Sequence, residues 1–278
     1  MKPGLSTAGW LDGAPVTKWL IYLNTGIWLT GLLGDVLQIP WMSSMGLLQR
    51  FAIFPEQMIA EGALWMPFTY MFLHGGALHL FMNMFGLYLL GPDLEKALGS
   101  VIYGALYLLA GFVGGIFFVL VTYLLLGSLH PCVGASGAIM GLLGAISAIY
   151  PQRVYLILPL MIPIRAVTLA VILTSVHIFF ILTPYGVGIA WDVHLFGGLA
   201  GYLFILSLAL RHRAAWKAKL VAWEPAQWIP EYEDLIRRRI LGETPLSAGE
   251  AARLEELREA LRYEDVPPPE EIAAERVR

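Results

Sequence analysis

The sequence predicts an all-α membrane protein, a bundle of six transmembrane helices followed by a charged C-terminal tail. Of its 278 residues, 58% are hydrophobic and 14% are charged, a balance that soluble domains of this length do not reach. The charges are also unevenly placed, because twelve of the 18 Lys and Arg residues and fourteen of the 21 Asp and Glu residues fall in residues 211–278. We therefore expect a short cytoplasmic segment at 1–18, a membrane domain at 19–210 and a cytoplasmic tail at 211–278.

Six apolar runs supply the predicted membrane helices. A helix needs about 20 apolar residues to cross a hydrocarbon core of about 30 Å. The second and fourth runs are short and rich in glycine, which is typical of membrane helices that pack among neighbours. The runs are residues 19–37, 76–91, 101–126, 134–150, 164–182 and 191–210.

The segment between the first two runs, residues 38–75, is too long for a simple turn and contains three prolines and two tryptophans. Backbone at membrane depth must satisfy its own hydrogen bonds, and tryptophan favours the interface. We expect this segment to be partly helical and to lie at the membrane surface.

Basic residues between the runs predict the orientation, because they favour the cytoplasmic side of a membrane. One side carries only Arg50, and the other carries Lys2, Lys18, Lys96, Arg153, Arg165 and the basic cluster at 211–219. Both termini are therefore expected in the cytoplasm, and in a bacterium the protein would span the inner (cell) membrane.

The tail predicts one amphipathic helix. Ser247 and Glu250 have capping-box spacing, and leucines follow at 254, 257 and 261 at helical intervals. Three prolines at 267–269 should end this helix, and we expect the rest of the tail to be disordered.

Composition also excludes several functions. A net charge of −3 provides no broad basic face, which disfavours nucleic acid as a partner. The single cysteine, Cys132, cannot form an internal disulfide, and no metal-ligand spacing of Cys and His occurs. No metal or organic cofactor is implied. The start of the chain lacks a signal-peptide cleavage pattern, so we expect the first run to be retained as a helix.

Ser136 is the candidate nucleophile. It lies in the sequence Gly-Ala-Ser-Gly at 134–137, where small neighbours leave its hydroxyl uncovered, and Gly137, Gly141 and Ala145 repeat every four residues. The alternative is that this motif serves packing alone, because serine and glycine are common at membrane helix contacts.

His194 is the candidate base. It opens the sixth run, and Gly197 and Gly201 follow at i+3 and i+7, which lets another helix approach the imidazole closely. A serine hydroxyl needs a base within about 2.6–3.2 Å to accept its proton. The alternative is a histidine that is simply solvated at a helix end.

His79 and Asn83 form a third constellation at i and i+4 on one face of the second run. Their donors could stabilise the oxyanion of a tetrahedral intermediate. Alternatively, the two side chains could hydrogen-bond to each other or to a neighbouring helix and so hold the helices together. A nucleophile, a base and a donor pair on three separate runs of one small protein favour catalysis over three unrelated packing motifs.

Together these motifs resemble the rhomboid family of intramembrane serine proteases. The segment at 65–99, Gly134–Gly137 and the His-x-x-Gly-x-x-x-Gly pattern at 194–201 occur in the family's order, and the resemblance covers about residues 20–210. It implies that Ser136 is the nucleophile and His194 the base, and that His79, Asn83 and the Ser136 N–H form the oxyanion hole. Glu95 and His74 match family positions with structural roles.

Two residues depart from the family pattern. Met66 replaces an arginine that follows Trp65 in many members, so the loop loses a possible hydrogen bond. Met140 lies four residues after the nucleophile, where an aromatic ring commonly packs on the histidine. A methionine sulfur can make a comparable contact, so we expect the imidazole orientation to survive.

Other polar residues carry weaker signals. We assign Cys132 a buried apolar role, because no base accompanies it. We assign His177 to packing or to a backbone hydrogen bond. Asp192 is two residues from His194 and so points to a different side of the helix, which favours a Ser–His dyad over a triad.

The predicted activity is hydrolysis of peptide bonds in or near transmembrane segments, with membrane proteins as substrates and the lipid bilayer as surroundings. One alternative is a non-catalytic relative that binds membrane clients, but such a protein would need no nucleophile beside a base. Another is a channel or transporter, which would be expected to carry more charge within its spans.

Overall fold

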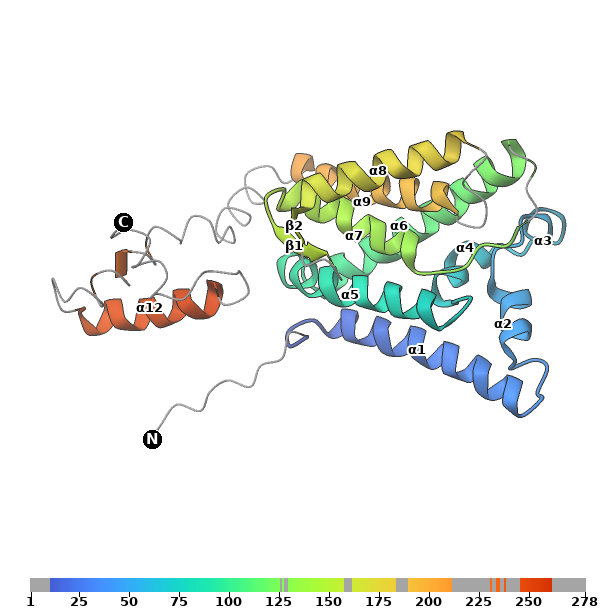
Figure 1. The fold of residues 1–278 in the computed structure, drawn as a ribbon, viewed down its shortest axis with the longest axis horizontal. Coiled ribbons are helices and arrows are strands. Elements are labelled where there is room, and N and C mark those ends of the chain that lie inside the picture. Colours follow the sequence, from blue (N-terminus) through green and yellow to red (C-terminus); the bar gives the residue numbers. More distant parts are fainter. Residues whose placement is uncertain are drawn as a thin grey trace. The chain divides into compact units, whose positions relative to one another are not determined.

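The computed structural model describes residues 11–125, 127, 130–157, 162–183, 190–211, 231, 234–235, 238 and 246–261. The chain forms two compact units, Met1–Arg211 and His212–Arg278. Each unit is helical over most of its described residues, apart from one short β-hairpin in the first. Figure 1 shows the order of these elements along the chain.

The helices of the first unit lie close to the predicted runs. Between the first and second long helices, the segment expected to be partly helical contains three short helices and one 3₁₀ turn. The helices are α1 (Pro15–Val36), α2 (Ser44–Phe51), α3 (Pro55–Ala60), α4 (Met66–Thr69), η1 (Tyr70–Phe72), α5 (Ala77–Leu98), α6 (Ser100–Phe118) with its π-helical continuation η2 (Val119–Leu125), α7 (Ser136–Ile149), α8 (Ala166–Leu182) and α9 (Trp191–Arg211).

α7 is the central helix of this unit. It packs against α5, α6, α8 and α9, whereas α1 packs on the outer side of α5 (Figure 1). Nine of its 14 residues are buried, and its innermost side chains are fully covered. The nucleophile candidate is therefore carried by the most enclosed helix of the membrane domain.

Glycines allow α7 and α9 to touch along their backbones. A Cβ atom on Gly197 or Gly201 would overlap the carbonyl oxygen of Gly137 or Gly141, and one on Gly144 would overlap that of Gly198. The predicted ridge of small residues on α7 is thus confirmed as a helix contact. This contact sets the spacing between the fourth and sixth predicted helices.

The fifth predicted helix starts two residues later than expected. Ile162–Arg165 forms strand β2, which pairs antiparallel with β1 (Val154–Ile157), so that Val154 lies opposite Arg165. The prediction that residues 164 and 165 are helical was wrong. Pro163 lacks a backbone donor and disfavours helical conformation in the residue before it, and the β-branched residues around it suit a strand.

Length and composition support fewer membrane crossings than the six predicted. Among the described residues, Ser100–Leu125 and Trp191–Leu210 are long and apolar enough to cross a membrane, and Met66–Phe72 with Ala77–Leu98, bent by 95°, counts as a third if taken together. α7 and α8 have 14 and 17 residues, and helices of these lengths extend only about 21 and 26 Å. Neighbouring helices bury most of α7, whereas α8 buries only Ala166 and His177.

The second unit contains the predicted amphipathic helix, α12 (Ala248–Leu261). The backbone N–H and hydroxyl of Ser247 donate to the Glu250 carboxylate at 2.9 Å each, so the predicted capping box is confirmed. Leu254 and Leu257 are buried together with Leu235. The prolines at 267–269 and the segment after them lie outside the described residues.

Candidate active site

Ser136 is the first residue of α7, and the backbone before it is tightly held. Gly134 has φ +121°, a region that side-chain-bearing residues rarely adopt, and its N–H donates to the Tyr70 carbonyl at 3.0 Å. The Tyr70 hydroxyl in turn donates to the Gly111 carbonyl on α6 at 2.7 Å. These contacts fix the start of α7 and therefore the position of the Ser136 hydroxyl.

His194 lies one turn into α9 and faces that hydroxyl. Its Nε2 atom is 2.6 Å from the Ser136 Oγ atom, across 58 residues of sequence. When Nε2 is unprotonated, the hydroxyl donates to it, and this is the arrangement in which an imidazole can accept the serine proton. The structure thus brings the predicted nucleophile and base into hydrogen-bonding contact.

His79 and Asn83, both on α5, lie beside the turn that precedes Ser136. A Cβ atom on Gly134 would be 2.6 Å from His79 Nε2 and 3.6 Å from Asn83 Nδ2, so only a glycine fits between these side chains. Asn83 is 6% exposed, and its Nδ2 has no hydrogen-bond partner among the described residues. A buried donor without a partner is costly and is available for a developing negative charge.

His74 packs beside this pair. Its ring centroid lies 5.1 Å from that of His79, in a tilted edge arrangement, and it is 8% exposed. The contact limits the orientations open to the His79 ring. This placement agrees with the supporting role expected for His74.

Glu95, at the other end of α5, is also placed as expected for a structural residue. It is 1% exposed, and it accepts hydrogen bonds from the N–H groups of Val16 and Thr17, both at 2.8 Å. The hydroxyls of Thr17 and Ser100 donate to the same carboxylate. Glu95 therefore caps the start of α1 and fixes it against α5 and α6.

Asp192 and Cys132 are two buried residues near the site. Asp192 is 3% exposed and accepts a hydrogen bond from the Val193 N–H at 3.0 Å. The Cys132 backbone pairs with Ile53 in both directions at 3.0 Å. Burial, with a contribution from the Asp192 charge, raises the pKa of the Cys132 thiol well above its ordinary value, so this residue is a poor nucleophile.

His177 lies closer to the site than the sequence indicated. We expected it to serve packing or a backbone hydrogen bond, and its ring packs with its centroid 5.0 Å from that of His194. The available signal was a histidine inside an otherwise apolar helix, which is expensive to bury. No group of three His, Cys, Asp or Glu side chains gathers as a metal site within the described part of the chain.

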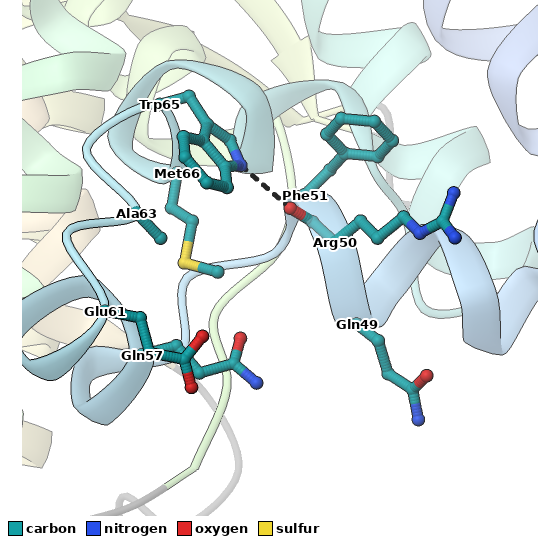
Figure 2. A pocket seen from close by; sticks show the side chains of 8 residues that line it. All are labelled: Gln49, Arg50, Phe51, Gln57, Glu61, Ala63, Trp65 and Met66. Atoms are coloured by element: carbon teal, nitrogen blue, oxygen red, sulfur yellow. Dashed lines mark hydrogen bonds between the residues drawn. The ribbon is translucent and has the colours of Figure 1, made fainter.

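A hollow of about 360 Å³ lies in the loop segment and not at Ser136. Figure 2 shows its walls, which come from α2, α3 and the start of α4. The Trp65 indole N–H donates to the Arg50 carbonyl at 2.9 Å beside it, and the Thr69 hydroxyl donates to the Phe51 carbonyl at 2.7 Å. Side chains that line it are Gln49, Arg50, Phe51, Gln57, Glu61, Ala63, Trp65 and Met66.

Met66 stands where many family members have an arginine, and its side chain is 2% exposed. The neighbouring Trp65 and Thr69 hold the loop to α2 through the two bonds just described. The rings that contact His194 are those of His177 and Trp191. The sulfur contact expected between Met140 and this imidazole stays a prediction.

Comparison with known proteins places these features in a family. The Rhomboid domain profile matches residues 61–211, more than half of the chain. RHOMBOID-like protein 4 of Arabidopsis thaliana is 34% identical over 159 residues, which is 55% of this chain and 36% of that protein. Rhomboid protease GluP of Bacillus subtilis is 38% identical over 100 residues, 36% of this chain and 18% of that protein.

RHOMBOID-like protein 5 of Arabidopsis thaliana is 37% identical over 117 residues, 38% of this chain and 32% of that protein. The chain therefore covers between 18% and 36% of the length of these three relatives. The part of the chain matched by the Rhomboid profile, residues 61–211, contains α4 to α9.

Proposed function

The chain belongs to the rhomboid family, and on this basis we propose that it is an intramembrane serine endopeptidase. It is an integral membrane protein of mostly helical fold. The proposed reaction is hydrolysis of peptide bonds in or near the transmembrane segments of other membrane proteins, carried out by Ser136 and His194. The contact of 2.6 Å between Ser136 Oγ and His194 Nε2 is the observation that carries the proposal.

In the first half of the reaction, His194 Nε2 accepts the hydroxyl proton as Ser136 Oγ attacks the substrate carbonyl carbon. The carbonyl oxygen becomes an oxyanion, for which Asn83 Nδ2, His79 and the Ser136 N–H are the candidate donors. When the tetrahedral intermediate collapses, the C–N bond breaks and the protonated imidazole gives its proton to the leaving amine.

In the second half, water attacks the acyl-serine ester and gives a proton to His194. The ester C–O bond breaks, the carboxylic acid leaves and Ser136 regains its proton. The Ser136 and His194 side chains and water account for these steps without a cofactor. A substrate helix has to unwind locally first, because its carbonyls are hydrogen-bonded and covered within a regular helix.

The membrane arrangement that we propose is a bundle of six helices, α1, α5, α6, α7, α8 and α9. The short α7 can lie within the bilayer because its neighbours cover it and small residues let them pack closely. The short α8 packs on α7 and α9 and would face lipid with its exposed apolar side chains. Nine basic residues flank the bundle on one side and only Arg50 on the other, which supports cytoplasmic termini in a bacterial inner membrane.

A non-catalytic protein that binds membrane clients is the second candidate. The shared fold would serve either function, and the chain covers only a part of the relatives that are named as proteases. The hydrogen-bonded pair favours catalysis, because client binding has no use for a serine hydroxyl held against an imidazole. Such a binder would show no turnover in a protease assay.

The test is an activity assay on the purified protein, reconstituted in lipid vesicles with a generic single-pass membrane substrate. Ser136→Ala and His194→Ala should each abolish cleavage without unfolding the bundle, and the double variant should be no worse than either, because nucleophile and base act as one unit. Near wild-type cleavage by Ser136→Ala would refute the proposal.

A further inference from the structure

α8 buries only Ala166 and His177, and its other apolar side chains are half-buried or exposed. His177 is 4% exposed, and its Nδ1 atom has no hydrogen-bond partner among the described residues. A buried imidazole with an unpartnered nitrogen lowers stability relative to an apolar ring of similar size. The residue is therefore not explained by the stability of the fold, and its ring contacts become the relevant feature.

Four rings meet where α8 packs on α9, and we call His177, Phe180, Trp191 and His194 the ring cluster. The His177 centroid lies 5.0 Å from that of His194 and 5.5 Å from that of Trp191. The ring centroids of Trp191 and His194 are 6.1 Å apart, and the two ring planes make an angle of 86°, which is a T-shaped arrangement. Phe180 stacks on Trp191, with ring centroids 4.5 Å apart and an angle of 13° between the ring planes. His194 is thus contacted by one ring from α8 and one from its own helix.

From this arrangement we infer that His177 is a positioning residue, which holds the His194 imidazole with Nε2 toward Ser136. The inference rests on the proposed function. The outer torsion of a histidine side chain has a broad, shallow preference, so the ring needs contacts to select one orientation. The hydrogen bond to Ser136 supplies one such contact, and the two rings that lie against the imidazole, those of His177 and Trp191, limit rotation about it.

His177 acts through His194 and does not act as a second base. The Ser136 hydroxyl has its hydrogen-bond contact with His194, while His177 makes ring contacts with His194 and Trp191. Misplacing a catalytic group by about 1 Å can lower the rate by about 100-fold. Removing the His177 ring should therefore slow the chemical step and leave substrate binding unchanged.

The experiment compares His177→Ala and His177→Phe in the full chain in lipid vesicles. We expect His177→Ala to lower kcat by roughly 10- to 100-fold with KM within about twofold of wild type. The rate at which a small fluorophosphonate labels Ser136 should fall in parallel, because labelling needs the base but no substrate. His177→Phe keeps a ring and should restore kcat to within about threefold, with a thermal midpoint at or above that of wild type.

Phe180→Ala is the matched control, because it removes a ring of the same α8–α9 contact that stacks on Trp191. Its kcat should stay within about threefold of wild type. The inference is overturned if His177→Phe is as slow as His177→Ala, if His177→Ala changes KM alone, or if Phe180→Ala is equally slow. Ser136→Ala separates the two claims, since retained cleavage there would overturn the proposed function whatever His177 does.

Discussion

Gly201 on α9 lies directly against Gly141 on α7, so closely that a Cβ atom on Gly201 would overlap the Gly141 carbonyl. The same two helices carry Ser136 and His194, so this backbone contact controls the distance between the two reacting groups. Gly201→Ala should force the helices apart, destabilise the protein by about 1–3 kcal/mol and lower turnover by about 100-fold.

Thermal unfolding and cleavage of a membrane substrate would measure both effects of Gly201→Ala. Gly26→Ala is a suitable control, because Gly26 lies in α1 and has no heavy atom within 4 Å of its Cβ position. It should keep full turnover and gain slightly in stability, since alanine favours a helix by about 1 kcal/mol over glycine. Equal behaviour of the two variants would show that the α7–α9 contact does not set the site geometry.

Asn83→Ala should lower turnover by roughly 10- to 1,000-fold, because it removes one donor from a shared oxyanion site. Labelling of Ser136 by a small fluorophosphonate should remain detectable, since Ser136 and His194 are intact. His79→Ala should behave similarly. If both variants cleave at the wild-type rate, the two side chains serve as contacts between helices and not as oxyanion donors.

Glu95→Ala should destabilise the fold by at least about 3 kcal/mol, because the carboxylate accepts hydrogen bonds from buried groups at the start of α1 and a buried donor left unpaired is costly. Glu95→Gln retains one oxygen acceptor and should lose less. Thermal unfolding in detergent can rank the variants, with the exposed Glu56→Ala as a control expected within about 0.5 kcal/mol of wild type. A stability loss no larger than that of Glu56→Ala would contradict this role.

The capping box makes a prediction about pH. Hydrogen bonding from the Ser247 N–H, with further contributions from the Arg238 and Ser247 side chains, lowers the pKa of Glu250 from 4.5 to about 2. Because the folded pKa is depressed, the stability that this carboxylate adds to α12 is present above about pH 4.5 and is lost as the pH falls through about 2. An NMR titration of the Glu250 carboxyl carbon should show this midpoint, and a higher one in Ser247→Ala. A midpoint near 4.5 in wild type would contradict the bonding described.

Topology decides where a substrate can be cut. Ser136 begins α7 and His194 lies in the first turn of α9. Each helix follows a segment that we expect on the outer side, so both side chains should lie near the outer face. Cleavage there should release the outer part of a substrate. Single cysteines at Glu56 and Ala248, in a Cys132→Ala background, can be probed in intact cells with an impermeant thiol reagent. We expect labelling at Glu56 alone. Labelling at Ala248 alone would invert the orientation.

Local patterns in the sequence determined much of this protein. Helical periodicity and apolar length depend on neighbours three or four residues apart, so the long helices and the capping box at Ser247 could be predicted. The small-residue ridge on α7 was readable for the same reason. The hairpin at Val154–Arg165 was missed, because its strands are four residues each and pair only with one another.

Contacts between helices were decided by the tertiary structure. The contact between His194 Nε2 and Ser136 depends on the relative shift and rotation of α7 and α9. The glycines allow the two helices to approach closely, but their positions in the sequence do not specify this shift and rotation. The left-handed backbone at Gly134 lies against His79 and Asn83, and no local pattern encodes that approach. His177 gave the same local signal as any buried histidine, and only the packing of α8 on α9 set its ring against His194. Side chains far apart in sequence meet through the summed packing of whole helices, so their pairing could be proposed from residue types but not located without the fold.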